Sequence, residues 1–242
     1  MKNQYLGDVG DYGKYSLLRH LALNGIRIGV NWYHTKNDDS KSSHGKNNRY
    51  LSDDTERMYA PAVFDAMGKL AFEEKKSISD IRVSELIPRA IYFEDVLSTD
   101  EIHWKERQTI RDRWHQTAME ALADAELIFA DPDTGVSKKV TRKGSDQYAG
   151  LSVVYYCHRA RRTESAWNEK KSELLALVPD AAIFVLTFHR GMQRSYIFAV
   201  HPSRAERYRK LIDSFLDSPW ETGVCGRPAP FEEETYRKES GC

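Results

Sequence analysis

Short apolar runs alternate along the chain with longer stretches in which apolar residues recur every three or four positions. The short runs predict strands, and the longer amphipathic stretches predict helices. The predicted strands cover residues 26–33, 90–93, 127–130, 151–157, 181–188 and 195–201. The predicted helices cover residues 16–23, 55–73, 100–125, 163–177 and 202–216. Strands that alternate with helices in this way indicate a parallel sheet covered by helices.

This order predicts an α/β fold with a single Rossmann-like, mostly parallel sheet, helices on both faces and an antiparallel C-terminal strand pair. The run 151–157 is almost continuously apolar, as in strands buried on both faces. The last two predicted strands are only six residues apart, which suits an antiparallel pair. Class I methyltransferases have this pattern, as do other doubly wound folds. We predict one domain over residues 1–217, followed by a loosely packed tail over residues 218–242.

Composition narrows the class of protein. The 242 residues include 36 Lys and Arg and 36 Asp and Glu, so the formal net charge is zero, which excludes a globally basic nucleic-acid binder. Bases nevertheless gather at 138–143 and 158–162, which leaves a local basic surface open. The three cysteines form no C-x-x-C pair, and no apolar run is long enough to span a membrane. We therefore expect a soluble cytoplasmic protein with no membrane partner.

The strongest chemical signal follows the strand at 127–130, which ends in Asp131-Pro132-Asp133-Thr134-Gly135. In open α/β sheets, ligands bind beyond the carboxyl ends of the strands, and Asp131 would lie there. Proline fixes the backbone as it leaves the strand, and glycine permits a tight turn. Asp131 and Asp133 are therefore candidate catalytic residues, although the same residue types also make ordinary turns.

A second signal lies near the N-terminus, where glycines, acids and tyrosines precede the first predicted helix. Three glycines within residues 7–13 indicate a structured loop over residues 7–15. Backbone amides at the start of the following helix could hold an anion, and the acids could hold hydroxyls, an amino group or a metal. The alternative is a set of helix-capping acids. The candidate residues of this segment are Tyr5, Asp8, Asp11, Lys14 and Tyr15.

A third signal is positive charge after the later strands. Such groups bind phosphate or carboxylate and could form a nucleic-acid surface beside Asp131. The candidate phosphate-binding residues are Lys138, His158, Arg161, Arg162 and His189. The long polar loop 34–49 contains His34 and His44, which have no metal-binding frame. We predict that Trp32, Trp104, Trp114 and Trp167 belong to the core rather than to stacking surfaces.

Two motifs, Asp11-Tyr12-Gly13-Lys14-Tyr15 before a helix and Asp131-Pro132 after a strand, resemble those of ribosomal RNA adenine-N6 methyltransferases. Those enzymes open with "HAGNHADVLKH" and end a strand in "DPPY". The resemblance implies a Rossmann-like domain that binds S-adenosylmethionine, with Asp11, Lys14 and Tyr15 near the cofactor, His34 at the end of the first strand and Asp131 at the reacting amine. As a methyltransferase, the protein would use Lys14 and Tyr5 to orient the substrate. The candidate cofactor-binding residues are Asp8, Asp11, Tyr15, His34 and Glu94.

The chain also resembles uncharacterised bacterial and phage proteins that carry "NQYFGD…DYxKY", "DPDNG" and "VVYQH" motifs. Here these motifs are residues 3–8, 11–15, 131–135 and 153–158. This resemblance implies no activity.

The chain departs from the methyltransferase pattern at two places. Asp133 and Thr134 replace the second proline and the aromatic residue that stacks on an extruded base. The first strand runs into Asn31-Trp32-Tyr33-His34-Thr35 and lacks the acid-x-Gly-x-Gly cofactor turn. A stacking group would then have to come from elsewhere, such as Tyr5 or Tyr148.

Three hypotheses follow. The first is an S-adenosylmethionine-dependent methyltransferase acting on an amine of a nucleic acid or nucleotide. The second is a nuclease or phosphodiesterase in which Asp131, Asp133 and Asp11 or Asp8 hold Mg²⁺ or Mn²⁺, which prefer oxygen ligands. The third is a non-catalytic binding protein on a degenerate methyltransferase fold, as in phage defence. The sequence does not distinguish oligomeric states.

Overall fold

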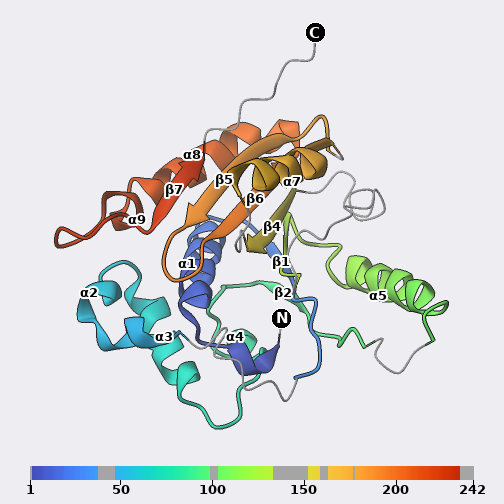
Figure 1. The fold of residues 1–242 in the computed structure, drawn as a ribbon, viewed down its shortest axis with the longest axis horizontal. Helices are drawn as coiled ribbons and strands as arrows, with labels where there is room; N and C mark the ends of the chain where they lie inside the picture. Colours follow the sequence, from blue (N-terminus) through green and yellow to red (C-terminus); the bar gives the residue numbers. More distant parts are fainter. Residues whose placement is uncertain are drawn as a thin grey trace.

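The sheet at the centre of the molecule contains seven strands in the part of the chain that the computed structural model describes (Figure 1). That part comprises residues 2–37, 47–98, 103–132, 152–158, 163–176 and 178–234. The strands follow the order β2-β1-β3-β4-β6-β5-β7 across the sheet. Their bounds are β1 Ile28–Asn31, β2 Ile91–Phe93, β3 Leu127–Ala130, β4 Ser152–His158, β5 Ala182–Phe188, β6 Arg194–Val200 and β7 Phe231–Glu234.

The predicted fold class is confirmed. Strands β2, β1, β3 and β4 are parallel neighbours. Strand β6 is antiparallel to both β4 and β5, so the predicted C-terminal pair forms and inserts its second strand next to the parallel part. An additional strand, β7, pairs antiparallel with β5. Because β6 runs against β4, its first residue lies at the carboxyl end of the parallel strands, where Arg194 pairs with His158.

Helices cover the sheet. Their bounds are α1 Val9–Leu23, α2 Asp54–Arg57, α3 Pro61–Ala71, α4 Ser79–Val83, α5 Arg107–Ala121, α7 Glu164–Ala176, α8 Ala205–Leu216 and α9 Pro219–Thr222. Short 3₁₀ turns are η1 Asn3–Tyr5, η2 Arg49–Ser52 and η3 Pro202–Arg204. No helix within the described ranges is both long and apolar enough to cross a membrane.

Alternate residues along the strands pack into cores on opposite faces of the sheet, as the two-residue period of a strand requires. On one face, Leu127 and Phe129 pack with residues of α1, α8 and α9 in the larger core. On the other face, Ile128 packs with Trp114 of α5, and Val185 packs with Trp167 of α7. Both faces are therefore covered.

Helix α1 begins at Val9, so the structured loop predicted over residues 7–15 is mostly helix. Asp8 caps the helix by accepting a hydrogen bond from the Gly10 amide at 2.7 Å. The glycines allow close contact rather than a turn. A Cβ atom at Gly13 would lie 2.9 Å from the Phe188 ring, and one at Gly10 would lie 2.2 Å from Nε of Arg194. Helix α1 can therefore approach the ends of β5 and β6.

Two further segments differ from the prediction. Residues 219–234, assigned to a loose tail, form α9 and β7 and contribute the buried side chains of Trp220 and Phe231 to the core. Glu234 of β7 also pairs with Lys171 of α7. Of the four tryptophans predicted to be in the core, Trp104 is 69% exposed, whereas Trp32, Trp114 and Trp167 are buried.

We predict that Gly13→Ala destabilises the protein although alanine is the better helix former. The helix gains about 1 kcal/mol, but pushing a methyl group into the buried Phe188 ring costs about 1–3 kcal/mol. Gly68→Ala in α3 is the matched control, because its Cβ would meet only Leu51 Cδ2 at 3.9 Å. We expect it to stabilise by about 0.5–1 kcal/mol. Urea denaturation measures both, and equal stabilisation by both variants would contradict the close contact at Gly13.

Candidate functional site

The site lies where the strand order reverses direction. From β1 the chain continues to β2 on one side of β1, and then to β3 on the other side. The carboxyl ends of β1 and β3 meet at this switch point, which is where open α/β sheets bind ligands. Asp131 follows β3 directly, and its amide donates to the Asn31 carbonyl at 3.0 Å. Asp131 and Asn31 are therefore neighbours at the carboxyl-end rim, as predicted for Asp131.

Lys14 of α1 connects the helix to this rim. Its Nζ lies 2.8 Å from Oδ2 of Asp131 and 2.8 Å from Oδ1 of Asp11. All three side chains are buried. Breaking such a buried pair by removing one partner leaves an uncompensated charge, which costs about 3–5 kcal/mol. The ion pair between Lys14 and Asp131 thus links the start of α1 to the end of β3.

Aromatic rings surround the same ammonium. The Nζ atom of Lys14 lies 5.1 Å from the ring centroids of Tyr15 and Tyr156, and 5.4 Å from that of Trp32. Desolvated cation–π contacts of this kind stabilise a buried cation. Burial alone lowers the pKa of Lys14, but the charges of Asp11 and Asp131 outweigh it and hold the pKa well above its usual value. Lys14 is therefore a permanent cation in the folded protein.

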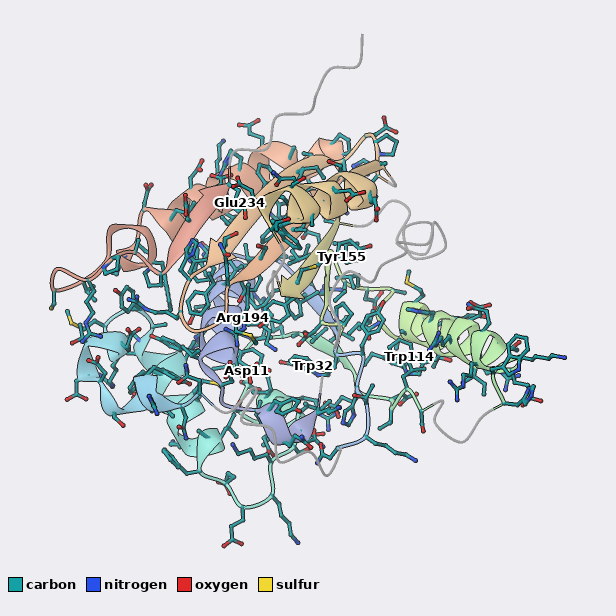
Figure 2. The ribbon with its side chains drawn as sticks, viewed as in Figure 1. Asp11, Trp32, Trp114, Tyr155, Arg194 and Glu234 are labelled. Atoms are coloured by element: carbon teal, nitrogen blue, oxygen red, sulfur yellow. The ribbon has the colours of Figure 1, made fainter. Side chains whose placement is uncertain are left out.

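Asp11 is held from both sides. Its Oδ1 meets Lys14, and its Oδ2 accepts the Gly7 amide at 3.0 Å. Burial raises the pKa of Asp11, and the Lys14 charge and hydrogen bond only partly oppose this effect. Figure 2 shows Asp11, Arg194 and Trp32 in the middle of the molecule, around the start of α1 and the ends of the strands.

Asp8 has a structural role in addition to any contact with a ligand. Its Oδ1 accepts from the Gly10 amide and from Nη2 of Arg194 at 2.5 Å, and its Oδ2 accepts from the Asn47 amide at 3.0 Å. Arg194 also donates through Nη1 to two carbonyls of the preceding loop. The pair Asp8–Arg194 is buried and closes the rim on the β6 side.

Several buried polar atoms at this rim have no hydrogen-bond partner among the residues that the structure describes. They are the hydroxyls of Tyr15 and Tyr196 and Nδ2 of Asn31. Oδ1 of Asn31 is used, because it accepts from the Tyr33 amide in the turn after β1. Burial raises the pKa of both tyrosines well above the usual value, so their hydroxyls stay protonated. Unpartnered buried donors call for an explanation, of which a bound water or ligand is one.

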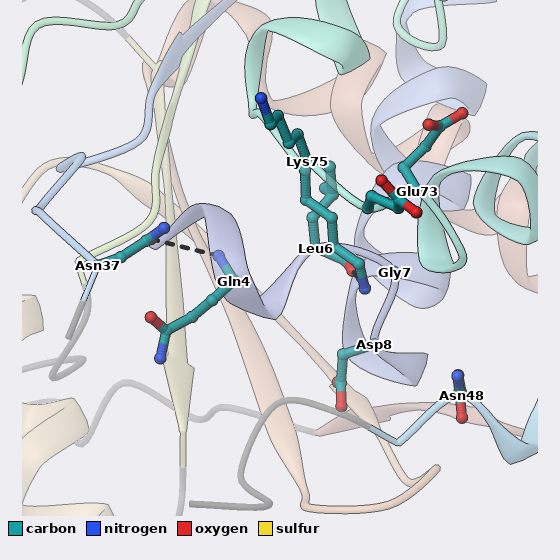
Figure 3. A pocket seen from close by; sticks show the side chains of 10 residues that line it. Gln4, Leu6, Gly7, Asp8, Asn37, Asn48, Glu73 and Lys75 are labelled. Carbon is teal, nitrogen blue, oxygen red and sulfur yellow. Dashed lines mark hydrogen bonds between the residues drawn. The ribbon is translucent and has the colours of Figure 1, made fainter. Parts of the chain in front are cut away.

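A polar pocket of about 580 Å³ opens beside the start of α1 (Figure 3). This volume is in the range of small-molecule sites. Side-chain amides of Gln4, Asn37 and Asn48 line it, and the Gln4 backbone amide donates to Oδ1 of Asn37 at 3.3 Å. The remaining lining residues are Leu6, Gly7, Asp8, Glu73, Glu74, Lys75 and Lys76. The pocket is joined to the rim through Gly7 and Asp8.

His34 and Glu94 lie together at the ends of β1 and β2. Nδ1 of His34 is 3.2 Å from the Glu94 carbonyl oxygen. The Glu94 side chain accepts from Oγ of Ser79 at 2.8 Å and lies 3.7 Å from Nε of Arg82. The chain leaves β1 through Trp32, which is buried, and Tyr33, whose φ is +46°. These two residues occupy the positions where a glycine turn would follow the strand.

The remaining candidates are separate or undescribed. Tyr5 lies in η1, half-buried, with Lys2 Nζ 6.0 Å above its ring. His189 follows β5 and contacts Oε2 of Glu232 at 3.1 Å. His158 ends β4, but only its backbone is described. Asp133, Lys138, Arg161 and Arg162 lie outside the described residues. Among the residues that are described, no three His, Cys, Asp or Glu side chains form a possible metal site.

Sequence reasoning missed Arg194, Asn31 and the ring of Tyr156. Arg194 had a usable signal, because the first residue of an antiparallel strand lies at the carboxyl end of its parallel neighbour. Asn31 is the polar residue of the buried strand Ile28–Asn31. For Tyr156 the strand position predicts burial but not the lysine under its ring.

No known protein-family model matches the chain, and no curated protein is significantly similar to it in sequence. Function must therefore be inferred from the chemistry of the site.

We predict that Lys14→Met destabilises the protein by about 3–5 kcal/mol near neutral pH, because two buried carboxylates lose their cation. The loss should shrink as pH falls. Lys14 lowers the pKa of Asp11, which burial raises, so removing Lys14 raises this pKa further. The folded variant therefore takes up a proton at higher pH than the wild type and regains stability relative to it as pH falls.

Lys210→Met is the matched control, since Lys210 pairs with Glu206 at 2.8 Å on the exposed face of α8. Its loss should leave the stability close to that of the wild type at every pH, because exposed ion pairs contribute little. Denaturant unfolding between pH 4.5 and 8 distinguishes the two variants. A Lys14→Met deficit that does not change with pH would contradict the buried cluster.

Proposed function

We propose that this chain is an S-adenosylmethionine-dependent methyltransferase-like protein that acts on an amine of a nucleic acid or nucleotide. The observation that supports it is the place of Asp131-Pro132, at the switch point and fixed by Lys14 from α1. A sheet that is mostly parallel and ends in an antiparallel pair is also the pattern of class I methyltransferases.

In this role Asp131 accepts a hydrogen bond from the substrate amine and orients its lone pair. Lys14 holds the Asp131 carboxylate in place, and Asp11 holds Lys14. Methyl transfer between bound partners depends mainly on such positioning, because a small misplacement costs about a hundredfold in rate. The bound cofactor would supply an electrophilic methyl group.

The residues at the rim fit the polar groups of this cofactor in part. Asn31 Nδ2 and the Tyr15 hydroxyl are buried without a hydrogen-bond partner in the described part of the chain and would bind its oxygens or nitrogens. Glu94 at the end of β2 offers a carboxylate for hydroxyls, next to His34. Trp32 stands where a glycine turn would follow β1, so its side chain prevents the cofactor from approaching the β1 backbone closely. The side chains of Asn31, Tyr15 and Glu94 would therefore provide the binding contacts.

The metal-dependent hypothesis is less well supported by this geometry. The ammonium of Lys14 lies between Asp11 and Asp131, at 2.8 Å from each, which is where that hypothesis needs the metal ion. A divalent ion would have to displace a buried lysine that also contacts three aromatic rings.

We predict that S-adenosylmethionine raises the melting temperature and that Mg²⁺ or Mn²⁺ does not. At 100 times its dissociation constant a ligand stabilises by about 2.7 kcal/mol, or roughly 5–10 °C for a chain of this length. Glu94→Gln should reduce the shift, and Glu232→Gln, an exposed rim acid that pairs with His189, should not. A shift with metal ions alone would favour the nuclease, and no shift at all would favour the non-catalytic protein.

A second prediction concerns transfer of radiolabelled methyl groups to RNA, DNA and nucleotides. Asp131→Ala should reduce transfer at least about a hundredfold, because the acceptor for the amine is lost. Asp131→Asn should keep part of the activity, since an amide oxygen also accepts a hydrogen bond. Full activity of Asp131→Ala, in a variant shown to be folded by its melting curve, would remove Asp131 from the site.

A further inference from the structure

Helix α5 has a packed half and a projecting half. Trp114 and Ala118 are its buried residues. Trp114 contacts Phe93 and Tyr33, at 5.1 Å between ring centroids in each case, and donates to the Asp95 carbonyl at 3.0 Å. These partners lie at the carboxyl ends of β1 and β2, so Trp114 sits level with the rim. Figure 1 shows α5 standing out to the side of the sheet.

The projecting part of the helix and the turn before it, residues 103–113, form what we call the α5 arm. None of its residues is buried, and none belongs to the cores that the described residues form. A polar helix without a packed face gains little stability from the rest of the protein. Its composition therefore points to a partner in solution rather than to folding.

One stripe of the helix continues from the packed half into the arm. Going back from Ala118, steps of four and three residues reach Trp114, Arg111 and Arg107. Residues at this spacing share a helix face. The stripe that buries Trp114 thus presents Arg111 and Arg107 beyond the rim, and the exposed Trp104 precedes them in the turn before the helix.

Trp104 is the unusual member of the arm. It is 69% exposed, with Nζ of Lys105 5.5 Å from its ring centroid and the His103 ring 5.8 Å away. The arm carries four cationic side chains, Lys105, Arg107, Arg111 and Arg113, against two acidic ones, Glu106 and Asp112. An exposed ring among cations is the combination that binds unpaired bases and their phosphates.

We propose that the α5 arm binds single-stranded nucleic acid, with Trp104 stacked on a base and Arg107 and Arg111 on phosphates. This inference rests on the proposed function and narrows its substrate class from any amine-bearing nucleotide to a polymer strand. A single strand is favoured over a duplex because only unpaired bases offer a face to an exposed indole.

The test is fluorescence anisotropy with labelled 20-nucleotide RNA, DNA and a duplex of the same sequence, without cofactor, at 50 and 200 mM salt. Trp104→Ala should weaken single-strand binding roughly fivefold to a hundredfold, the range for loss of one stacked base. Trp104→Phe should restore most of it. Arg111→Gln should weaken binding and lower the slope of log affinity against log salt by about 0.7.

Two variants serve as controls. Phe72→Ala removes another exposed ring, 71% accessible at the end of α3, and should change nothing. Arg113→Gln removes an exposed arm charge that lies off the stripe and should have less effect than Arg111→Gln. The inference is overturned if Trp104→Ala stays within twofold of the wild type, if Arg113→Gln matches Arg111→Gln, or if the duplex binds better.

Because no cofactor is present, this experiment is independent of the methyltransferase assignment. If the protein binds single strands but S-adenosylmethionine does not raise its melting temperature, the role of the α5 arm stands and the proposed function fails. If S-adenosylmethionine raises the melting temperature but no strand binds, the proposed function stands and the role of the arm fails.

Discussion

A buried lysine must be neutralised where it is buried, and this requirement organises the rim of the sheet. Lys14 contacts two carboxylates from different parts of the chain, Asp11 on its own helix and Asp131 after β3. The ion pairs set the distance between helix and sheet, and the surrounding rings keep water out. Asp8 and Arg194 repeat the arrangement one turn earlier on the helix. Two buried ion pairs thus fix α1 against strands that form the candidate site.

The sheet could be predicted from the sequence because its strands are short apolar runs. The run Leu127–Ala130 was predicted at its observed bounds, and the antiparallel pair followed from its short link. The position of Asp131 beyond the end of β3 was predicted for the same reason, since the end of a clearly apolar strand is easy to locate. The start of α1 was not, because Gly10 and Gly13 are typical of loops and only the approach of Arg194 and Phe188 explains them in a helix.

Other parts of the site depend on contacts between distant residues, which local patterns do not contain. Nothing near Lys14 in the sequence shows that it is buried among Tyr15, Trp32 and Tyr156. Trp104 was misplaced for a related reason. The sequence predicted a helix over residues 100–125, but α5 begins at Arg107, and Trp104 lies exposed in the turn before it. The zero net charge likewise averages over an arm in which cations outnumber acids.

The glycine contacts of α1 have a consequence for the order of assembly. Asp8 and Arg194 are 186 positions apart, so this ion pair of α1 forms only after β6 has been synthesised. Closing so long a loop is slow. The sheet is therefore expected to form around β3 and β4 first, with α1 docking late. The candidate site thus joins α1 to strands that are synthesised long after it.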